Sequence, residues 1–511
     1  MPIDIPSLEQ LASISRWHNL DLSDEDLREM QQLMRDGLAS LKRVEALEEP
    51  KNPVVDNRDR GRAPTPEENR YNQWAWRCRI GSSASGPLAG KTVGVKDNIC
   101  VAGVPMRNGS ALMEGFVPDI DATVVTRILE AGGEIVGKTT CDNLCFSATG
   151  QTPITGPVKN PYDPERLSGG SSAGSAVALV AGDCDLALGG DQGGSIRLPA
   201  CWSGCVGHKP TYGLVPYTGC FPLEMSLDHV GPLARSVGDV ATLLDVIAGP
   251  DDKDFRQAPM PAGAAYREQL SLRLDGLRIG IVQEGFGWEG KSEPEVDETV
   301  REAALRFTDL GAVVRDVSIP LHRDGVHIWN VIGIEGTLTT MMQGDCAGRG
   351  WKGEYPTELV AFFGEMRRKK GRDLPPMVRY VTLFGQFLSD TYGGRYYAKA
   401  QNLARALKAA YDVALTETHI LVMPTTPMRA IPYIPNQRLA EYAKTTQINI
   451  DNAAPFDATG HPSLSVPVAV VGGLPVGMML AGRSWEDGTV LRAGYAFQQR
   501  FAPDFIKPIT V

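Results

Sequence analysis

The sequence of 511 residues predicts an α/β fold built on a largely buried sheet. Between residue 90 and about residue 249, short apolar runs such as TVGV, GEIVGK and DLALGGD alternate with helical stretches such as TVVTRILEAGG and VGDVATLLDVIAG. A second strand pattern, LRIGIV, follows a connection rich in proline and aspartate. After a helix-rich middle, from Pro294 to about Leu415, strand patterns return at HILVMPT and in a closing hairpin.

The N-terminal part of the chain predicts a separate helical segment. Residues 6–46 carry leucines and methionines near helical spacing, and SDEDL predicts a helix start at Ser23. The following stretch, EEPKNPVVDNRDRGRAPTPEENR, is charged and contains proline, which is typical of an exposed linker. We therefore expect residues 1–75 to form a helical segment with its linker, and residues 76–511 to form the main domain.

Composition narrows the class of protein and its partners. The net charge of −10 argues against nucleic acid or an anionic membrane as a partner and favours a small molecule. The start, MPIDIPSLEQL, lacks the features of a secretory signal, and the uncharged run VPVAVVGGLPVGMMLAG is broken by a glycine turn. We expect a cytoplasmic protein. Its nine cysteines include no CxxC pair, which favours buried thiols over disulfides or zinc.

The stretch from Ser168 to Pro199 holds the candidate nucleophile. The run SAGSAVALVAG predicts a closely packed helix, and DLALGGD predicts a buried strand that delivers Ser195 on a glycine turn. Gly193 and Gly194 have no Cβ, so their backbone N–H groups can approach a carbonyl, as an oxyanion hole requires. We therefore predict Ser195 as the nucleophile.

A serine nucleophile needs a base, and the sequence offers a lysine. Lys96 ends the alternating apolar run in GKTVGVKDNI, which predicts a strand. Burial at that position favours a neutral amine, because desolvation disfavours the charged form. A Ser–Lys pair is a known variant of the catalytic triad. Lys96 is the candidate general base.

Together, VGVKDN, GGSSAGS and GGSIRLP resemble the amidase signature family over about residues 76–500. The resemblance implies one mixed sheet flanked by helices on both faces. It also implies that Lys96 is the base, that Ser171 relays the proton after a cis peptide bond to Gly170, and that Ser195 attacks the carbonyl. The backbone N–H groups that would form the oxyanion hole are those of Gln192, Gly193, Gly194 and Ser195.

Residues beside the triad have candidate supporting roles. Asp191 and Arg197 flank Ser195, and an ion pair that holds the turn is the interpretation we prefer. Ser172 and Ser175 fit either helix-start caps or hydrogen bonding beside the relay. Gln192 stands where the family more often has threonine or isoleucine, and its side chain is a candidate substrate contact.

Within the family, the sequence resembles the enantioselective amidases associated with nitrile metabolism. VAGVPMRNGS, DNLCFS, GGDQGGSIR, VGHKPTYGLVPYTG, HIWNVI and FDATGHPSLSVP carry this resemblance. It implies hydrolysis of small aliphatic or aromatic amides to carboxylic acid and ammonia, usually in a homodimer, with the N-terminal helices as a possible pairing element. The alternative for those helices is a wrapping arm without a role of its own. It also implies that Phe146, Leu227, Trp329 and Ile450 wall the acyl side of the site, with ordinary core packing as the alternative for each.

Other functions stay open on the same residues. A carbamate, anilide or ester hydrolase uses the same acyl chemistry, and the A subunit of a tRNA-dependent amidotransferase has the same fold but lacks the N-terminal extension. A catalytically inactive binding protein with the same fold is disfavoured, because Lys96, Ser171 and Ser195 are all present. This chemistry needs no metal or other cofactor.

Several competing motifs fail on physical grounds. GGEIVGKT in residues 132–139 fits a phosphate-binding pattern, but its centre predicts a strand, not a flexible loop. GGSIR lacks the last glycine of an α/β-hydrolase elbow. His208, His229 and His461 lie in turns that favour structural roles. His322 and His327 have no acidic helix partner of the HExxH kind, which argues against a metal site.

Overall fold

The structure, a computed structural model, describes residues 4–50, 54, 58–81, 85–260 and 265–509. Contacts along the chain divide it into two compact units, residues 1–53 and residues 54–511. The division falls inside the stretch that the sequence predicts as a linker.

The first unit is a helical hairpin of α1 (Leu8–Trp17) and α2 (Asp24–Glu45). The side chain of Ser7 caps α1, and Ser23 caps α2 at the predicted position. In both caps the third helical residue, Gln10 or Asp26, bonds back to the backbone of the capping serine, which satisfies amide groups that the first helical turn leaves unpaired. Leu11 and Leu27 are buried between the helices.

The second unit is organised around one mixed sheet. Among the described residues it has twelve strands in the order β1-β2-β4-β3-β5-β7-β6-β11-β12-β10-β8-β9. Strand β3 runs parallel to β4 and β5, β8 runs parallel to β9 and β10, and the other pairs are antiparallel. The strands are β1 (Asp59–Arg62), β2 (Trp74–Ile80), β3 (Thr92–Lys96), β4 (Glu134–Thr139), β5 (Leu186–Asp191), β6 (Val206–Lys209), β7 (His229–Ala234), β8 (Arg278–Val282), β9 (Val313–Val317), β10 (Ile420–Pro424), β11 (Ser463–Val471) and β12 (Leu474–Gly482).

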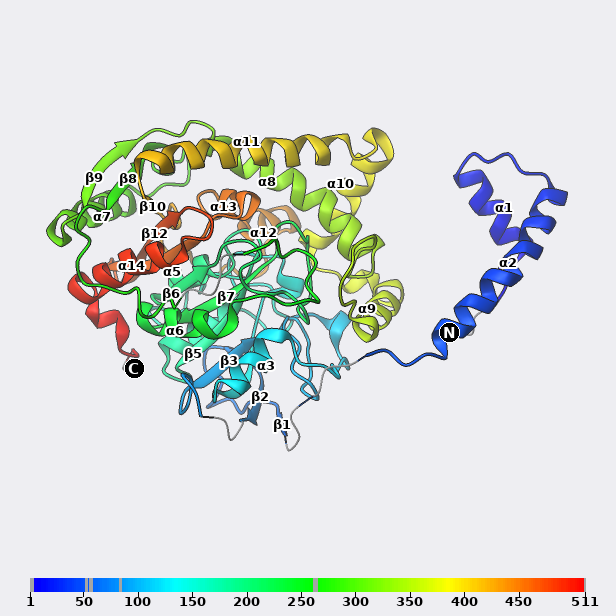
Figure 1. The fold of residues 1–511 in the computed structure, drawn as a ribbon, viewed down its shortest axis with the longest axis horizontal. Helices are drawn as coiled ribbons and strands as arrows, with labels where there is room; N and C mark the ends of the chain where they lie inside the picture. Colours follow the sequence, from blue (N-terminus) through cyan, green and yellow to red (C-terminus); the bar gives the residue numbers. More distant parts are fainter. Residues whose placement is uncertain (1–3, 51–53, 55–57, 82–84, 261–264, 510–511) are drawn as a thin grey trace. The chain divides into compact units, whose positions relative to one another are not determined.

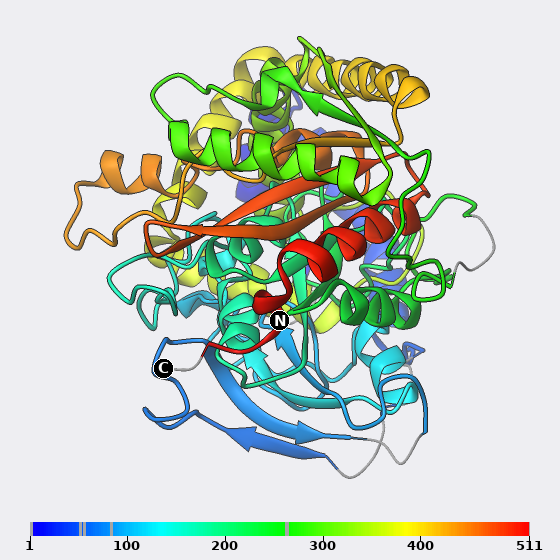
Figure 2. The ribbon, with the colours of Figure 1, turned by 90° about the vertical axis from the view of Figure 1, so that its left-hand side faces the viewer.

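Helices cover both faces of this sheet (Figure 1). The helices that contact the strands are α3 (Thr123–Glu130), α4 (Ala173–Val180), α5 (Arg197–Ser203), α6 (Val237–Ile247), α7 (Pro294–Leu305) and α14 (Asp487–Phe501). Further helices pack mainly on one another: α8 (His322–Thr337), α9 (Thr357–Lys369), α10 (Pro376–Tyr392), α11 (Arg395–Glu417), α12 (Leu439–Thr445) and α13 (Ala454–Thr459). Helices α3, α6 and α14 form one layer, and Figure 2 shows α14 lying along the hairpin of β11 and β12.

The central strand β5 shows why both faces are buried. Successive side chains of a strand point to opposite faces. Leu186 and Leu188 belong to the apolar cluster that includes α3 and α6, whereas Ala187 belongs to the cluster that includes α4 and α5. Small residues on the second face let α4 approach the sheet closely. These observations confirm the predicted mixed α/β fold.

Two strands differ from the sequence predictions. Asp59–Arg62, inside the predicted exposed linker, forms β1 at one edge of the sheet, and Val313–Val317, inside the predicted helical middle, forms β9 at the other edge. Both are short and mostly solvent-exposed, so neither carries an apolar alternation that the sequence could reveal. Backbone pairing with the open edge of the neighbouring strand accounts for them.

No helix in the described part of the chain is long and apolar enough to cross a membrane. The nine cysteines are all buried and unpaired, as the sequence predicts.

Candidate active site

The parallel strands β3 and β5 end side by side and place the candidate base. Lys96 is the last residue of β3 and is fully buried. Its Nζ donates hydrogen bonds to Ser171 Oγ at 2.8 Å and to the carbonyl oxygen of Gly190, near the end of β5, at 3.2 Å. The structure therefore brings Lys96 and Ser171, 75 positions apart in the sequence, into direct contact.

Ser171 lies just before α4, and the peptide bond between Gly170 and Ser171 is cis, as the resemblance predicts. Only glycine fits at position 170, because a Cβ there would lie 2.0 Å from Asp142 Oδ2. The next residue, Ser172, donates its backbone N–H to the carbonyl oxygen of Ser195 at 3.2 Å. This bond ties the segment of Ser171 to the loop that carries Ser195.

Ser172 and Ser175 bind the sheet and do not cap α4. Ser172 Oγ donates to Gly190 O at 3.1 Å and accepts from Gly190 N–H at 3.2 Å. Ser175 Oγ donates to Leu188 O at 2.9 Å. Because Gly190 O also accepts from Lys96, Ser172 shares a hydrogen-bond acceptor with the candidate base.

The loop between β5 and α5 is held by the Asp191 carboxylate. It accepts backbone N–H groups from Gly194 at 2.5 Å and from Ile196 at 3.0 Å, and the Arg197 side chain at 3.0 and 3.1 Å. Arg197 also donates to Asp457 at 2.6 Å. Burial alone would raise the pKa of Asp191, but Arg197 and the backbone N–H groups hold it well below its ordinary value. The structure thus contains the predicted ion pair and extends it to Asp457.

The same carboxylate changes the expected set of oxyanion-hole donors. The N–H of Gly194 is occupied by Asp191. In the described part of the chain, the N–H groups of Gln192, Gly193 and Ser195 have no hydrogen-bond partner. Three of the four predicted donors are therefore free for a ligand, and the correction at Gly194 follows from the nearby carboxylate.

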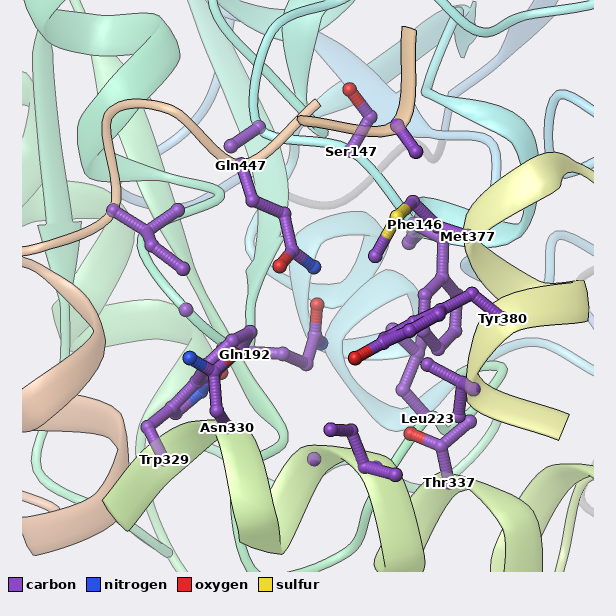
Figure 3. Close-up of a pocket in the computed structure, with 18 of the residues that line it drawn as sticks. Phe146, Ser147, Gln192, Leu223, Trp329, Asn330, Thr337, Met377, Tyr380 and Gln447 are labelled. Carbon is purple, nitrogen blue, oxygen red and sulfur yellow. The ribbon is translucent and has the colours of Figure 1, made fainter. Parts of the chain in front are cut away.

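Ser195 opens into a large apolar cavity of about 980 Å³. The five predicted pocket residues all line it, namely Phe146, Gln192, Leu227, Trp329 and Ile450. Figure 3 shows Trp329 and Asn330 of α8 on one side and Met377 and Tyr380 of α10 on the other. Lys96 and Ser171 do not line this cavity, because they lie behind Ser195 in the interior.

Trp329 does more than wall the cavity. Its indole Nε1 donates to the carbonyl oxygen of Gln192 at 2.5 Å. A Cβ at Gly193 would lie 2.6 Å from the ring, so the glycine allows the ring to pack on the loop. The side chain therefore supports the backbone that presents the free N–H groups.

Sequence reasoning missed the wall that α10 and α12 contribute. That wall consists of Met377, Tyr380, Val381 and Phe384 of α10 and Ala440, Ala443 and Lys444 of α12. Cys145 of the DNLCFS motif, which also lines the cavity, was missed as well. The i, i+4 pair Tyr380 and Phe384 is a visible signal, since both are large and partly exposed. Helical periodicity does not say which cavity such a face lines.

The candidate histidine bases lie away from Ser195. His208 pairs with Asp487, and His461 with Asp412, while His229 contacts Leu227 O and Lys209. None of these three lines the cavity. Across the residues that the structure describes, no group of three or more His, Cys, Asp or Glu side chains is arranged to hold a metal ion.

Comparison with known proteins finds one matching family and two kinds of similar protein. The model of the Amidase family matches residues 65–491. An enantioselective amidase of Rhodococcus rhodochrous is 42% identical over 497 residues, which cover 95% of this chain and 94% of that protein. The A subunit of a glutamyl-tRNA(Gln) amidotransferase from Methanosarcina barkeri is 36% identical, over 81% of this chain and 85% of that one.

Two solved structures share the fold. The crystal structure of the A subunit of glutamyl-tRNA(Gln) amidotransferase from Thermotoga maritima aligns with a TM-score of 0.69 at 27% identity, covering 98% of this chain and 96% of that one. The native peptide amidase of Stenotrophomonas maltophilia aligns with a TM-score of 0.66 at 32% identity, covering 82% and 84%.

Proposed function

Since the chain belongs to the amidase family and is an amide-hydrolysing enzyme, we propose that it converts small aliphatic or aromatic amides to carboxylic acid and ammonia. The supporting observation is the buried Lys96–Ser171 contact of 2.8 Å behind Ser195, which opens into an apolar cavity. An apolar acyl group gains roughly 25 cal/mol per Å² when it leaves water, so this cavity suits the acyl part of an amide.

In the proposed mechanism, Lys96 Nζ accepts a proton from Ser171, which takes the proton of Ser195. Ser195 Oγ then forms a bond to the carbonyl carbon, and the carbonyl π electrons move to oxygen. The proton returns through Ser171 to the amide nitrogen as the C–N bond breaks, which releases ammonia. Water attacks the resulting ester by the same route and frees the acid.

The negative oxygen of the tetrahedral intermediate needs hydrogen-bond donors. The unpartnered backbone N–H groups of Gln192, Gly193 and Ser195 supply them in this proposal. Asp191 and Trp329 keep this loop in place from the interior and from the cavity side.

A second candidate is the A subunit of an amidotransferase, favoured by the Thermotoga maritima alignment over 98% of the chain. The amidase of Rhodococcus rhodochrous covers 95% of this chain, whereas the Methanosarcina barkeri protein covers 81%. That difference favours an independent amidase. The purified chain alone is expected to release ammonia from a primary amide, and dependence on partner proteins would reverse the order of the two candidates.

The leaving group is tested with a panel of primary amides, anilides, carbamates and esters that share one acyl group. We expect primary amides to have a higher kcat/KM than anilides and carbamates. If primary amides were the poorest amide-type substrates, the substrate proposal would be wrong while the catalytic residues could still be right.

We further propose that the first unit, with the linker that follows it, pairs two copies of the chain. One face of α2 carries large apolar side chains that are 38–66% exposed: Met30, Leu33, Met34, Leu41 and Val44. Their spacing places them on one side of the helix, which is typical of an interaction surface.

Sedimentation equilibrium tests this pairing. The parent protein is expected to be a dimer, and the double variant Leu33→Glu, Leu41→Glu a monomer. Gln32→Glu, on the opposite face of α2, is the matched control and should stay dimeric. A dimeric double variant would place the contact elsewhere.

A further inference from the structure

The side-chain oxygen of Gln192 has no hydrogen-bond partner in the described structure. The residue is 5% exposed and lines the cavity, and its Oε1 is buried without a hydrogen-bond partner among the described residues. Figure 3 shows the side chain extending into the cavity opposite Gln447. A buried acceptor without a partner is uncommon in folded proteins and calls for a donor.

A chain of hydrogen bonds fixes the orientation of this amide. Tyr217 OH donates to the carbonyl oxygen of Phe221 at 3.1 Å, so it has no second proton to offer. It can therefore only accept from Gln192, and Nε2 lies 3.1 Å from it. The nitrogen faces Tyr217, and the oxygen faces the cavity.

Further polar side chains lie around the same space. Those of Gln447, Asn330 and Tyr380 line the cavity. In Figure 3 the amide of Gln447 and the hydroxyl of Tyr380 point inward. The cavity is thus lined mostly by apolar side chains with a few polar ones among them, which is the usual form of a specific ligand pocket.

The donor belongs to the acyl part of the substrate. The leaving nitrogen must face Ser171 to receive its proton, and Ser171 and Lys96 do not line the cavity. Gln192 does line it, and its own backbone lies at the proposed oxyanion site. Its side chain therefore lies on the acyl side of the site, close to the proposed oxyanion site.

We propose that Gln192 Oε1 accepts a hydrogen bond from a hydroxyl or N–H on the first or second acyl carbon, so that the preferred substrates are amides of hydroxy or amino acids. This rests on the function proposed above. Tyr217 is the positioning residue, because it holds the amide oxygen toward the cavity.

Matched substrate pairs provide the test. One pair is 2-hydroxy-2-phenylacetamide and 2-phenylpropanamide, and the other is 3-hydroxy-3-phenylpropanamide and 3-phenylbutanamide. Each pair exchanges a hydroxyl for a methyl group of similar size. In the parent enzyme, kcat/KM for the hydroxy member of at least one pair is expected to exceed that of its partner by about tenfold or more, since a buried acceptor disfavours an apolar group.

Three variants locate the effect. Gln192→Met keeps the length but removes the acceptor, and it should abolish the preference. Tyr217→Phe frees the amide to rotate, and it should reduce the preference even if Gln192→Met does not fold. Tyr380→Phe removes a hydroxyl from the opposite wall and tests whether that hydroxyl makes the contact instead. Tyr396→Phe, at an exposed position of α11 that does not line the cavity, is the control that keeps the preference.

The outcomes separate this inference from the proposed function. If the parent hydrolysed neither member of either pair nor any other primary amide, the proposed function would fail. Equal kcat/KM within both pairs would overturn the role of Gln192 alone. Loss of the preference in Tyr380→Phe but not in Gln192→Met would assign the contact to Tyr380. An equal loss for both members in Gln192→Met, with esters spared, would mean that Oε1 binds the scissile NH₂ group.

Discussion

At the scale of single residues, Lys96 has a fully buried amine whose hydrogen bonds go to Ser171 and to Gly190 O. A base in this position accepts the proton that Ser171 passes on. The proposed mechanism therefore predicts that Lys96→Ala, which has no amine, lowers kcat/KM nearly as far as Ser195→Ala does, because it removes the base.

Neither His229 nor His461 is expected to serve as that base. Burial holds the pKa of His229 well below its ordinary value and lowers that of His461, so both stay neutral as the pH rises. We predict that His229→Gln and His461→Asn, measured separately, keep most of the kcat/KM of the parent. A loss in either folded variant as large as that of Lys96→Ala would point to a histidine base.

His322 makes the stability of the fold depend on pH. Burial lowers its pKa to about 4, against an ordinary 6.5, and its ring contacts Tyr411 and Asn452. The unfolded chain therefore takes up a proton as the pH falls below about 6.5, while the folded protein does not until about 4. Stability is present above pH 6.5 and declines between these values, by about 3 kcal/mol from this group.

Urea denaturation between pH 4 and 7 checks this expectation. The parent should lose stability over that range more steeply than His322→Gln, which cannot be protonated. Parallel curves for the two proteins would show that another group controls the acid sensitivity.

At the scale of structural elements, the loop between β5 and α5 depends on one buried carboxylate. Replacing Asp191 with Asn removes the charge that pairs with Arg197 and weakens the acceptor for the Gly194 and Ile196 N–H groups. Breaking a buried pair from one side costs about 3–5 kcal/mol. We predict that Asp191→Asn lowers stability by about this amount and also lowers kcat.

Chemical denaturation with a matched surface variant tests the loop. Asp316→Asn removes an exposed partner of Arg301 and should cost less than about 1 kcal/mol. Comparable losses of stability in the two variants would show that Asp191 does not organise the loop.

Helix α8 contributes to the cavity through Trp329. Trp329→Ala should lower kcat/KM more for a benzamide-sized substrate than for an acetamide-sized one, since only the larger acyl group fills the space. Trp329→Phe keeps most of the apolar surface but removes the bond to Gln192 O, so it should lower kcat for both substrates alike. An unchanged substrate ranking in folded Trp329→Ala would remove this residue from the acyl pocket.

The elements also show what sequence could predict. Buried strands such as β3 and β5 carry apolar runs because both faces are covered, so their ends and the residues Lys96 and Ser195 could be located. The edge strands β1 and β9 carry no such pattern. The occupied N–H of Gly194 depends on a turn geometry that brings Asp191 close, which residue types alone do not specify.

At the scale of the whole molecule, the cavity combines the β5–α5 loop with α8, α10 and the segment around α12. Residues such as Tyr380 and Gln447 join Ser195 there only after the chain has folded, so their place in the site could not be predicted from spacing. The proposed pairing through the first unit involves residues outside this cavity. We therefore expect substrate selection and assembly to be separable by mutation.

The central claim is that Ser195 forms an acyl-enzyme. Acid quenching during turnover of a slowly hydrolysed amide, followed by mass spectrometry of peptides, measures this directly. The account predicts an added acyl group on Ser195 that is absent from Ser195→Ala, whose kcat should fall below about one per cent of the parent. An acyl group found instead on Cys145 or Lys96, or a Ser195→Ala enzyme that retains most of its activity, would contradict the account.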